Sequence, residues 1–86
     1  MSYKFTIEAP NGARYEWSPL HWGNAQYYVC KDVHYRVYLC NGVWIVATPN
    51  CHVPSPNQYV SPYPELVCQY ATRLHELMLD IRRART

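Results

Sequence analysis

The sequence predicts an α+β fold, in which an antiparallel sheet of about five strands packs against one long C-terminal helix. Three observations support this prediction. Runs of alternating apolar and polar residues indicate strands, two Asn-Gly pairs indicate tight turns, and one apolar stripe with helical spacing occupies the end of the chain. The chain has 86 residues, which is enough for a single domain over residues 1–86 and too short for two separate cores.

The first predicted hairpin joins strands at residues 3–9 and 13–17. Apolar and polar side chains alternate in the first segment, and the second continues the alternation through Tyr15 and Trp17. The intervening Pro-Asn-Gly segment, residues 10–12, favours a chain reversal because proline presets its φ angle and Asn-Gly tolerates the left-handed region. Pro19 cannot donate a hydrogen bond to a central strand, so it indicates a break in the ladder. Residues 18–25 then form either a short helical turn or an extended segment, and the sequence does not distinguish the two.

Three further strands are expected at residues 26–30, 33–40 and 43–48. The Asn41-Gly42 pair is the strongest hairpin signal in the chain, and a two-residue turn there pairs Cys40 with Val43. That register divides the hairpin into two faces. The expected core face carries Val33, Tyr35, Val37, Leu39, Trp44 and Val46, and the opposite, mixed face carries His34, Arg36, Tyr38, Cys40, Val43 and Ile45.

The last part of the chain is expected to hold a proline-rich strap and then the helix. Residues 49–64 contain five of the seven prolines, so we expect a strap without ladder pairing over residues 49–63. The helix is predicted over about residues 64–84, with Pro64 in its first turn. Its expected packing stripe is Leu66, Tyr70, Leu74, Leu77, Met78 and Ile81, with Val67 and Ala71 beside it.

Composition narrows the class of protein. Eight Lys and Arg against six Asp and Glu give a net charge of +2, far from the basic excess of a dedicated nucleic-acid coat. No apolar run approaches the roughly 18 residues of a membrane span, and the chain begins without a secretory signal pattern. We therefore expect a cytoplasmic protein, located in the host cytoplasm if it is encoded by a virus.

The motifs of common enzymes do not occur in the sequence. It contains no Gly-rich phosphate loop, no Gly-x-Ser-x-Gly elbow and no His-Glu-x-x-His, so we predict that the chain is not an enzyme and needs no cofactor. Free thiols are the favoured state of the four cysteines in a reducing compartment, and a Cys30–Cys51 disulfide is the best-placed alternative. Cys30, His34, Cys51 and His52 are weak candidates for a metal site, because the usual close cysteine pair is absent.

Aromatic content points to protein binding. Leu, Ile, Val and Phe together number only 18, whereas the chain holds nine Tyr and three Trp, which are enriched at protein interfaces. The predicted contact residues are Trp22, Tyr27, His34, Arg36, Tyr38 and Tyr59. The expected function is a small non-enzymatic module that binds a larger protein or complex and inhibits it stoichiometrically. It is similar to phage and viral anti-defence proteins such as the anti-CRISPRs in size only. Whether the chain forms a homodimer is left open by the sequence.

The alternative function is binding of RNA or single-stranded DNA. Half of all Lys and Arg lie in the last fourteen residues, at Arg73, Arg82, Arg83 and Arg85. An arginine-rich helix end next to aromatic stacking surfaces on the sheet is a pattern typical of proteins that bind single-stranded nucleic acids. Charge compensation at the negative end of the helix dipole explains the same arginines without a ligand.

Overall fold

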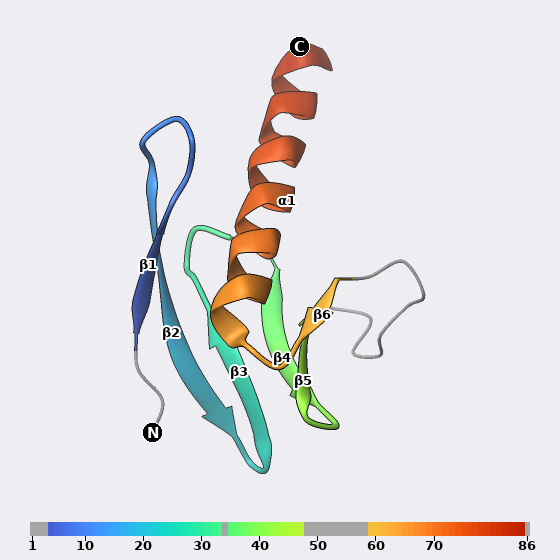
Figure 1. Cartoon of the computed structure of the whole chain (residues 1–86). Helices are drawn as coiled ribbons and strands as arrows, with labels where there is room; N and C mark the ends of the chain where they lie inside the picture. The colour runs from blue at the N-terminus through green and yellow to red at the C-terminus, as the bar shows by residue number, and fades with distance from the viewer. Residues whose placement is uncertain (1–3, 34, 48–58, 86) are drawn as a thin grey trace.

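The structure is a computed structural model of the chain, in which residues 4–33, 35–47 and 59–85 are described. It confirms the predicted α+β fold, an antiparallel sheet followed by one long helix. Within the described residues six strands pair in chain order, β1 to β6, and the helix α1 follows them (Figure 1). The elements are β1 (Phe5–Glu8), β2 (Arg14–Trp22), β3 (Ala25–Val29), β4 (Arg36–Cys40), β5 (Val43–Ala47), β6 (Val60–Ser61) and α1 (Pro64–Arg85).

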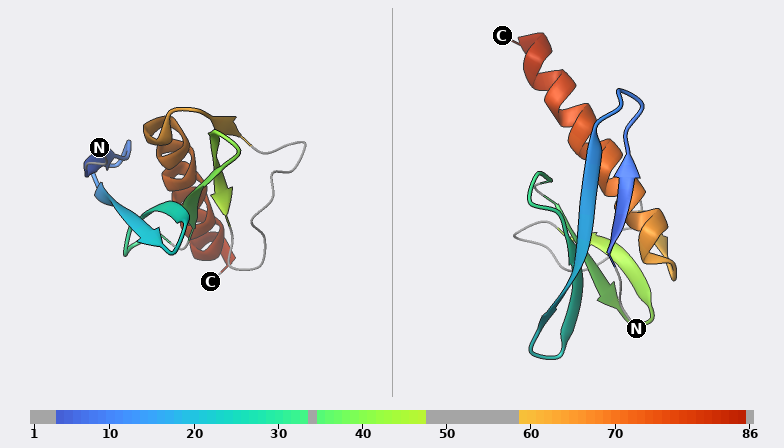
Figure 2. Two further views of the ribbon diagram at one scale, coloured as in Figure 1. Left: turned by 90° about the horizontal axis from the view of Figure 1, so that it is seen from below. Right: turned by 90° about the vertical axis from the view of Figure 1, so that its left-hand side faces the viewer.

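The sheet curls toward the helix and partly encloses it, as the two views in Figure 2 show. We call the face of the sheet that packs on α1 the inner face and the opposite face the outer face. The core lies between the inner face and the helix, and it is rich in aromatic rings because the chain has few aliphatic side chains. Its buried members on the sheet include Ile7, Tyr15, Trp17, Tyr28, Val37, Trp44 and Val46, and those on the helix are Val67, Cys68 and Ala71.

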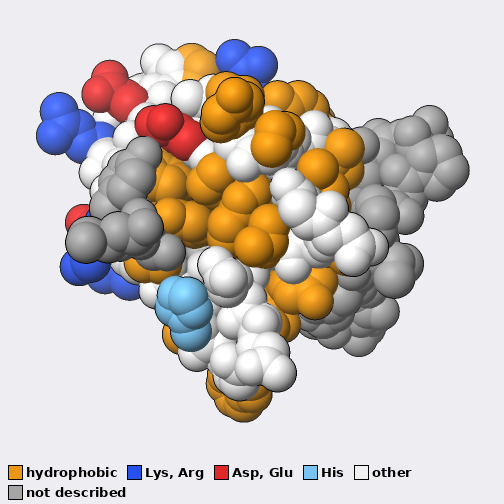
Figure 3. All heavy atoms as spheres, turned by 60° about the horizontal axis from the view of Figure 1, so that its bottom comes forward, with side chains coloured by type: hydrophobic (Ala, Val, Ile, Leu, Met, Phe, Trp, Pro, Cys, Tyr) orange, Lys and Arg blue, Asp and Glu red, His pale blue; other side chains and the backbone are white. Residues whose placement is uncertain are grey.

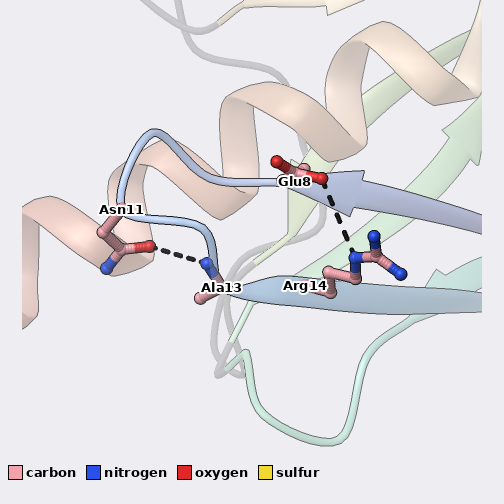
Figure 4. Close-up of polar contacts among 4 residues, drawn as sticks. All are labelled: Glu8, Asn11, Ala13 and Arg14. Atoms are coloured by element: carbon pink, nitrogen blue, oxygen red, sulfur yellow. Dashed lines mark hydrogen bonds and ion pairs between the residues drawn. The ribbon is translucent and has the colours of Figure 1, made fainter.

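The turn between β1 and β2 has the conformation that its sequence favours. The backbone N–H of Gly12 donates to the carbonyl of Ala9, and the N–H of Ala9 donates to the carbonyl of Ala13. Gly12 has a φ of 89°, a left-handed conformation that side chains disfavour. Asn11 Oδ1 accepts a hydrogen bond from the N–H of Ala13 at 3.0 Å, which fixes the turn further (Figure 4).

Strand β2 runs through the proline that the sequence indicated as a break. Residues 18–25 are extended, with a turn at Gly23 and Asn24, so the option of a short helical turn is wrong. The reason is a change of partner along β2. Pairing with β1 ends at Trp17, and pairing with β3 begins at Ser18. Pro19 N therefore faces the side where β1 has already ended, and no ladder hydrogen bond is lost there.

The hairpin β4–β5 has the predicted register, with Cys40 opposite Val43 and Leu39 opposite Trp44. Val37 and Val46 are buried in the core, and Leu39 packs against it, which confirms the predicted core face. The proline-rich strap was expected to lack ladder pairing over residues 49–63, but Val60–Ser61 forms the short strand β6 beside β5. The positions 49–58 of the strap lie outside the described residues.

The helix packs on the sheet mainly through residues beside the predicted stripe, although Tyr70 of that stripe is partly buried and packs against the core. Its buried residues are Val67, Cys68, Ala71 and Thr72, whereas the predicted Leu66, Leu77, Met78 and Ile81 are 42%, 56%, 40% and 41% exposed. Small side chains face the sheet because the inner face is already filled by indole and phenol rings. The end of the helix also projects past β4 and β5 (Figure 1), so these two strands do not cover its last apolar residues, and Leu77 lies opposite β1 instead.

Candidate functional site

The outer face of the sheet carries a continuous row of apolar and aromatic side chains. The pairing register places Leu20, Tyr27, Tyr38, Ile45 and Val60 next to one another on β2, β3, β4, β5 and β6. Ile45 is completely buried, although it does not belong to the core on the inner face. Ile45 is therefore the buried member of the row, and its other members are half-buried or exposed.

Tyr27 and Tyr38 form the centre of this row. They lie directly opposite each other on β3 and β4, and their ring centroids are 5.1 Å apart with an angle of 34° between the ring planes. Cross-strand aromatic pairs restrict each other's rotamers, so both rings are held in place before any partner arrives. Both side chains are half-buried, which leaves part of each ring accessible.

Arg36 and Trp22 flank the tyrosine pair. Arg36 lies two residues before Tyr38 on the same face, is exposed, and is the only charged residue among the outer-face positions of β3, β4 and β5. Trp22 ends β2 at the turn to β3 and is 74% exposed. We use the name outer-face cluster for Trp22, Tyr27, Arg36 and Tyr38, four of the six residues predicted as contact residues.

The other two predicted contact residues do not join this cluster. The ring of Tyr59 stacks on Tyr70 of α1 with centroids 5.3 Å apart and an interplanar angle of 23°, so it belongs to the helix side of the sheet. His34 lies outside the described residues. Tyr63, just before α1, is 66% exposed.

A second apolar surface lies at the end of the molecule where α1 begins. Figure 3 looks at this end and shows hydrophobic side chains gathered in its middle, with Lys, Arg, Asp and Glu side chains at one margin. Leu66 in the first turn of α1 is 42% exposed, and Leu39 near the β4–β5 turn is only half-buried. Sequence reasoning missed this surface because it assigned Leu66 to the packing stripe of the helix.

The arginines of the helix are not next to the outer-face cluster. Arg73, Arg82 and Arg83 are exposed on α1, which packs on the inner face, and Arg83 Nη1 is 3.9 Å from Asp80 Oδ1. The C-terminal end of α1 and the turn that carries Trp22 lie at opposite ends of the molecule (Figure 1). Arg85 belongs to the helix, but its side chain is not among those described. The sheet therefore separates the arginine-rich helix end from the aromatic residues.

The described thiols are free. Cys30 and Cys68 are buried and Cys40 is half-buried, and none of them forms a disulfide. Burial is the main reason why the pKa of the Cys68 thiol is far above its usual value. Of the four metal candidates, only Cys30 lies among the described residues, and these residues contain no cluster of three or more His, Cys, Asp or Glu that fits a metal ion.

A polar cluster joins β2 to the helix. The hydroxyl of Tyr15 donates a hydrogen bond of 2.5 Å to Glu76 Oε2. The rings of Tyr15 and His75 are T-shaped to each other, with centroids 5.9 Å apart. The hydrogen bond to Glu76 and burial raise the pKa of Tyr15 to about 12, so its hydroxyl stays protonated and acts as a donor. No sequence pattern indicated this contact, since Tyr15 and Glu76 are 61 positions apart.

A groove runs between the edge strand β1 and the helix, with a volume of about 890 Å³. One wall is formed by residues 6–11, and the other is formed by helix residues that include Arg73, Glu76, Leu77, Asp80 and Arg83. On the outer side of β1, Glu8 Oε2 is 3.7 Å from Arg14 Nε (Figure 4). Thr6 and Glu8 on the β1 wall of this groove are exposed.

Comparison of the chain with protein-family models, with curated proteins and with solved structures gives no match. Among the described residues, no helix combines the length and the apolar character that crossing a membrane requires.

Proposed function

We propose that the chain is a non-enzymatic module that binds a larger protein or protein complex through the outer-face cluster. The observation that carries the proposal is the Tyr27–Tyr38 pair, two rings fixed across β3 and β4 with Arg36 on the same face. Tyr, Trp and Arg are the residue types that most often dominate the free energy of protein–protein binding.

The physical argument is one of low entropic cost. A tyrosine has few rotatable bonds, and packing against a neighbouring ring restricts them further, so little side-chain freedom remains to be lost on binding. The fully buried Ile45 lies beside Tyr38 in the same row and supports it from β5. A partner that covers these rings buries apolar surface, while the phenol hydroxyls and the Arg36 guanidinium offer directional hydrogen bonds.

Such a module acts by occupying the surface of its partner, which is the mode of a stoichiometric inhibitor. The proposal includes a cytoplasmic site of action. A reducing compartment of this kind would keep the thiols of Cys30, Cys40 and Cys68 free.

Nucleic-acid binding is the less well supported alternative. A composite site needs the arginines close to the stacking rings. The outer-face cluster and the exposed Arg82 and Arg83 lie on opposite sides of the sheet, which does not favour such a site.

The test is a comparison of three immobilised proteins. The original chain, the Tyr38→Ala/Arg36→Ala variant and the Arg82→Ala/Arg83→Ala variant are incubated with lysate of the source cells, with and without nuclease. Circular dichroism verifies that all three are folded. We expect a protein that the original chain and the helix-end variant retain despite nuclease. The outer-face variant should bind it at least about tenfold more weakly, since two anchors of this kind contribute more than about 1.4 kcal/mol.

The opposite pattern rejects the proposal. Retention that is lost only in the Arg82→Ala/Arg83→Ala variant, is removed by nuclease and falls steeply with salt supports nucleic-acid binding instead. Equal retention by all three proteins excludes the outer-face cluster as the binding surface.

A further inference from the structure

Strand β1 is an edge of the sheet, because among the described strands it pairs only with β2. The N–H of Ala9 donates to the carbonyl of Ala13 at 2.8 Å. Hydrogen-bonded pairs alternate with non-hydrogen-bonded pairs along an antiparallel ladder. Phe5 and Ile7, which have the same parity as Ala9, therefore direct their backbone groups to β2.

The intervening residues direct their backbone groups the other way. Thr6 and Glu8, and Lys4 just before the strand, present their N–H and C=O groups to the open edge of β1. Unpaired edge groups of this kind are a template for another strand, and proteins often protect them with charged side chains. Here the charges are of opposite sign at the two ends, Lys4 at one and Glu8 at the other.

This short segment is complementary to itself in the antiparallel direction. When two copies pair around Thr6, Lys4 of one copy lies opposite Glu8 of the other, and Phe5 lies opposite Ile7. All edge-facing residues then fall in hydrogen-bonded pairs, as the ladder requires. A shift by two residues keeps the hydrogen-bonding parity but places a charged residue opposite Thr6. Only the register centred on Thr6 satisfies both charges.

We propose that two copies of the chain associate through antiparallel pairing of their β1 edges, with Thr6 at the twofold axis. The outer face then carries one row of alternating charge across four strands. Glu8 is already 3.7 Å from Arg14 within one copy, and Lys4 is 3.8 Å from Glu16. Pairing places Lys4 of each copy next to Glu8 of the other, so that Lys4 and Glu8 each gain a second neighbour of opposite charge. This inference does not depend on the proposed function.

The surroundings of the edge leave room for the second copy. The groove between β1 and α1 opens along this edge, and Leu77 on its helix wall is 56% exposed. The twofold axis is perpendicular to the sheet, so both helices lie on the same side of the joined sheet and the two grooves meet. A strand from an unrelated protein finds the same backbone groups but must also match the order of the charges.

The first test exchanges charges between two variants. In Lys4→Glu, position 4 repels Glu8 of an identical copy, and in Glu8→Lys, position 8 repels Lys4 of an identical copy. Analytical ultracentrifugation over a concentration series should show that each variant alone dimerises at least about tenfold more weakly than the original chain. An equimolar mixture of the two variants pairs Glu with Lys at both ends, so the heterodimer should recover near-original affinity.

The second test removes one backbone donor. Thr6→Pro deletes an N–H that points to the open edge and leaves the β1–β2 ladder intact, since proline is tolerated on that side of an edge strand. We expect it to abolish dimerisation, whereas Thr6→Val, which keeps the N–H, retains it. Near-ultraviolet circular dichroism confirms that the variants are folded.

Four results overturn the proposal, the first three of which come directly from the tests above. These three are a chain that stays monomeric at the highest concentrations, a dimer that Thr6→Pro does not weaken, and charge variants that fail to form a heterodimer when mixed. Binding of an unrelated extended peptide to β1 in preference to a second copy also rejects it.

Discussion

The indole Nε1 of Trp17 donates a hydrogen bond of 3.0 Å to Oγ1 of Thr72, and both side chains are buried. The hydroxyl of Thr72 donates in turn to the carbonyl oxygen of Cys68, one helical turn earlier, at 2.8 Å. These two linked hydrogen bonds connect the middle of β2 to the helix through the core. They satisfy the polar atom of Trp17, the largest fully buried side chain among the described residues, and fix where the helix lies along the sheet.

Thr72→Val is expected to destabilise the fold by about 1–3 kcal/mol, because it leaves the buried N–H of Trp17 without an acceptor. Valine has nearly the same shape, so the change isolates the hydrogen bond. Thr72→Ser keeps the hydroxyl and serves as the control. Urea unfolding followed by tryptophan fluorescence gives both free energies of unfolding. Equal stability of Thr72→Val and the original chain contradicts the role assigned to this hydrogen bond.

The buried stripe of the helix should tolerate no enlargement. Ala71 is completely buried against the inner face, so Ala71→Leu is expected to cost about 1–3 kcal/mol through overpacking. Leu77→Ala changes a residue that is 56% exposed and should alter stability by no more than about 0.5 kcal/mol. Thermal unfolding of the two variants compares these positions. A larger loss from Leu77→Ala than from Ala71→Leu means that the helix packs through the other stripe.

Tyr15 is expected to make the free energy of unfolding depend on pH in the alkaline range. Its folded pKa is about 12 against 10.0 for an unperturbed tyrosine, mainly because it donates a hydrogen bond to Glu76 and is buried. Below pH 10 both the folded and unfolded states keep the proton, so Tyr15 adds no pH dependence. Between pH 10 and pH 12 the unfolded chain releases the proton first, and the free energy of unfolding should fall as pH rises.

Tyr15→Phe removes this proton and the hydrogen bond. Its unfolding free energy should be lower near neutral pH and should fall less steeply between pH 10 and pH 12 than that of the original chain. Urea unfolding at a series of pH values measures both slopes. Identical slopes rule out a raised pKa at Tyr15.

Thiol reactivity should follow burial. In a Cys51→Ser background, the half-buried Cys40 is expected to react with iodoacetamide under native conditions well before Cys30 and Cys68. Burial also raises the pKa of Cys68, which keeps it in the unreactive protonated form. Peptide mass spectrometry after a time course identifies the modified cysteines. Early modification of Cys68 indicates that the helix separates readily from the sheet.

The parts of the fold that depend on local sequence could be predicted. Asn41-Gly42 fixes a two-residue turn, and that turn alone sets the pairing of Cys40 with Val43 and the division of the hairpin into faces. The placement of Tyr38 beside Tyr27 follows from the same alternation once β3 and β4 are neighbours. The shared face of Tyr27, Arg36 and Tyr38 was accordingly predicted from sequence, whereas the place of Trp22 was not, because residues 18–25 were left open between a helical turn and an extended segment.

The face of the helix could not be predicted in the same way. Two apolar stripes lie side by side on α1, and the stripe of Leu66, Leu77 and Ile81 is the more hydrophobic. The sheet selects the smaller stripe of Cys68 and Ala71 because aromatic rings already fill the space above it. The separation of the arginines from the outer face also depends on how the helix packs on the sheet, so it could not be predicted from the sequence either. Pro19 was misread because the end of β1 is not visible in local sequence.

Site-specific photocrosslinking tests the central claim most directly, namely that the outer face of the sheet is the binding surface. A photoreactive phenylalanine analogue replaces Tyr38 in one protein and Tyr63 in another, both aromatic positions, the second being 66% exposed at the start of the helix. Each is irradiated in nuclease-treated lysate of the source cells. The account predicts one discrete protein adduct from position 38 and none from position 63. Adducts from position 63 alone, or adducts to nucleic acid in untreated lysate alone, contradict it.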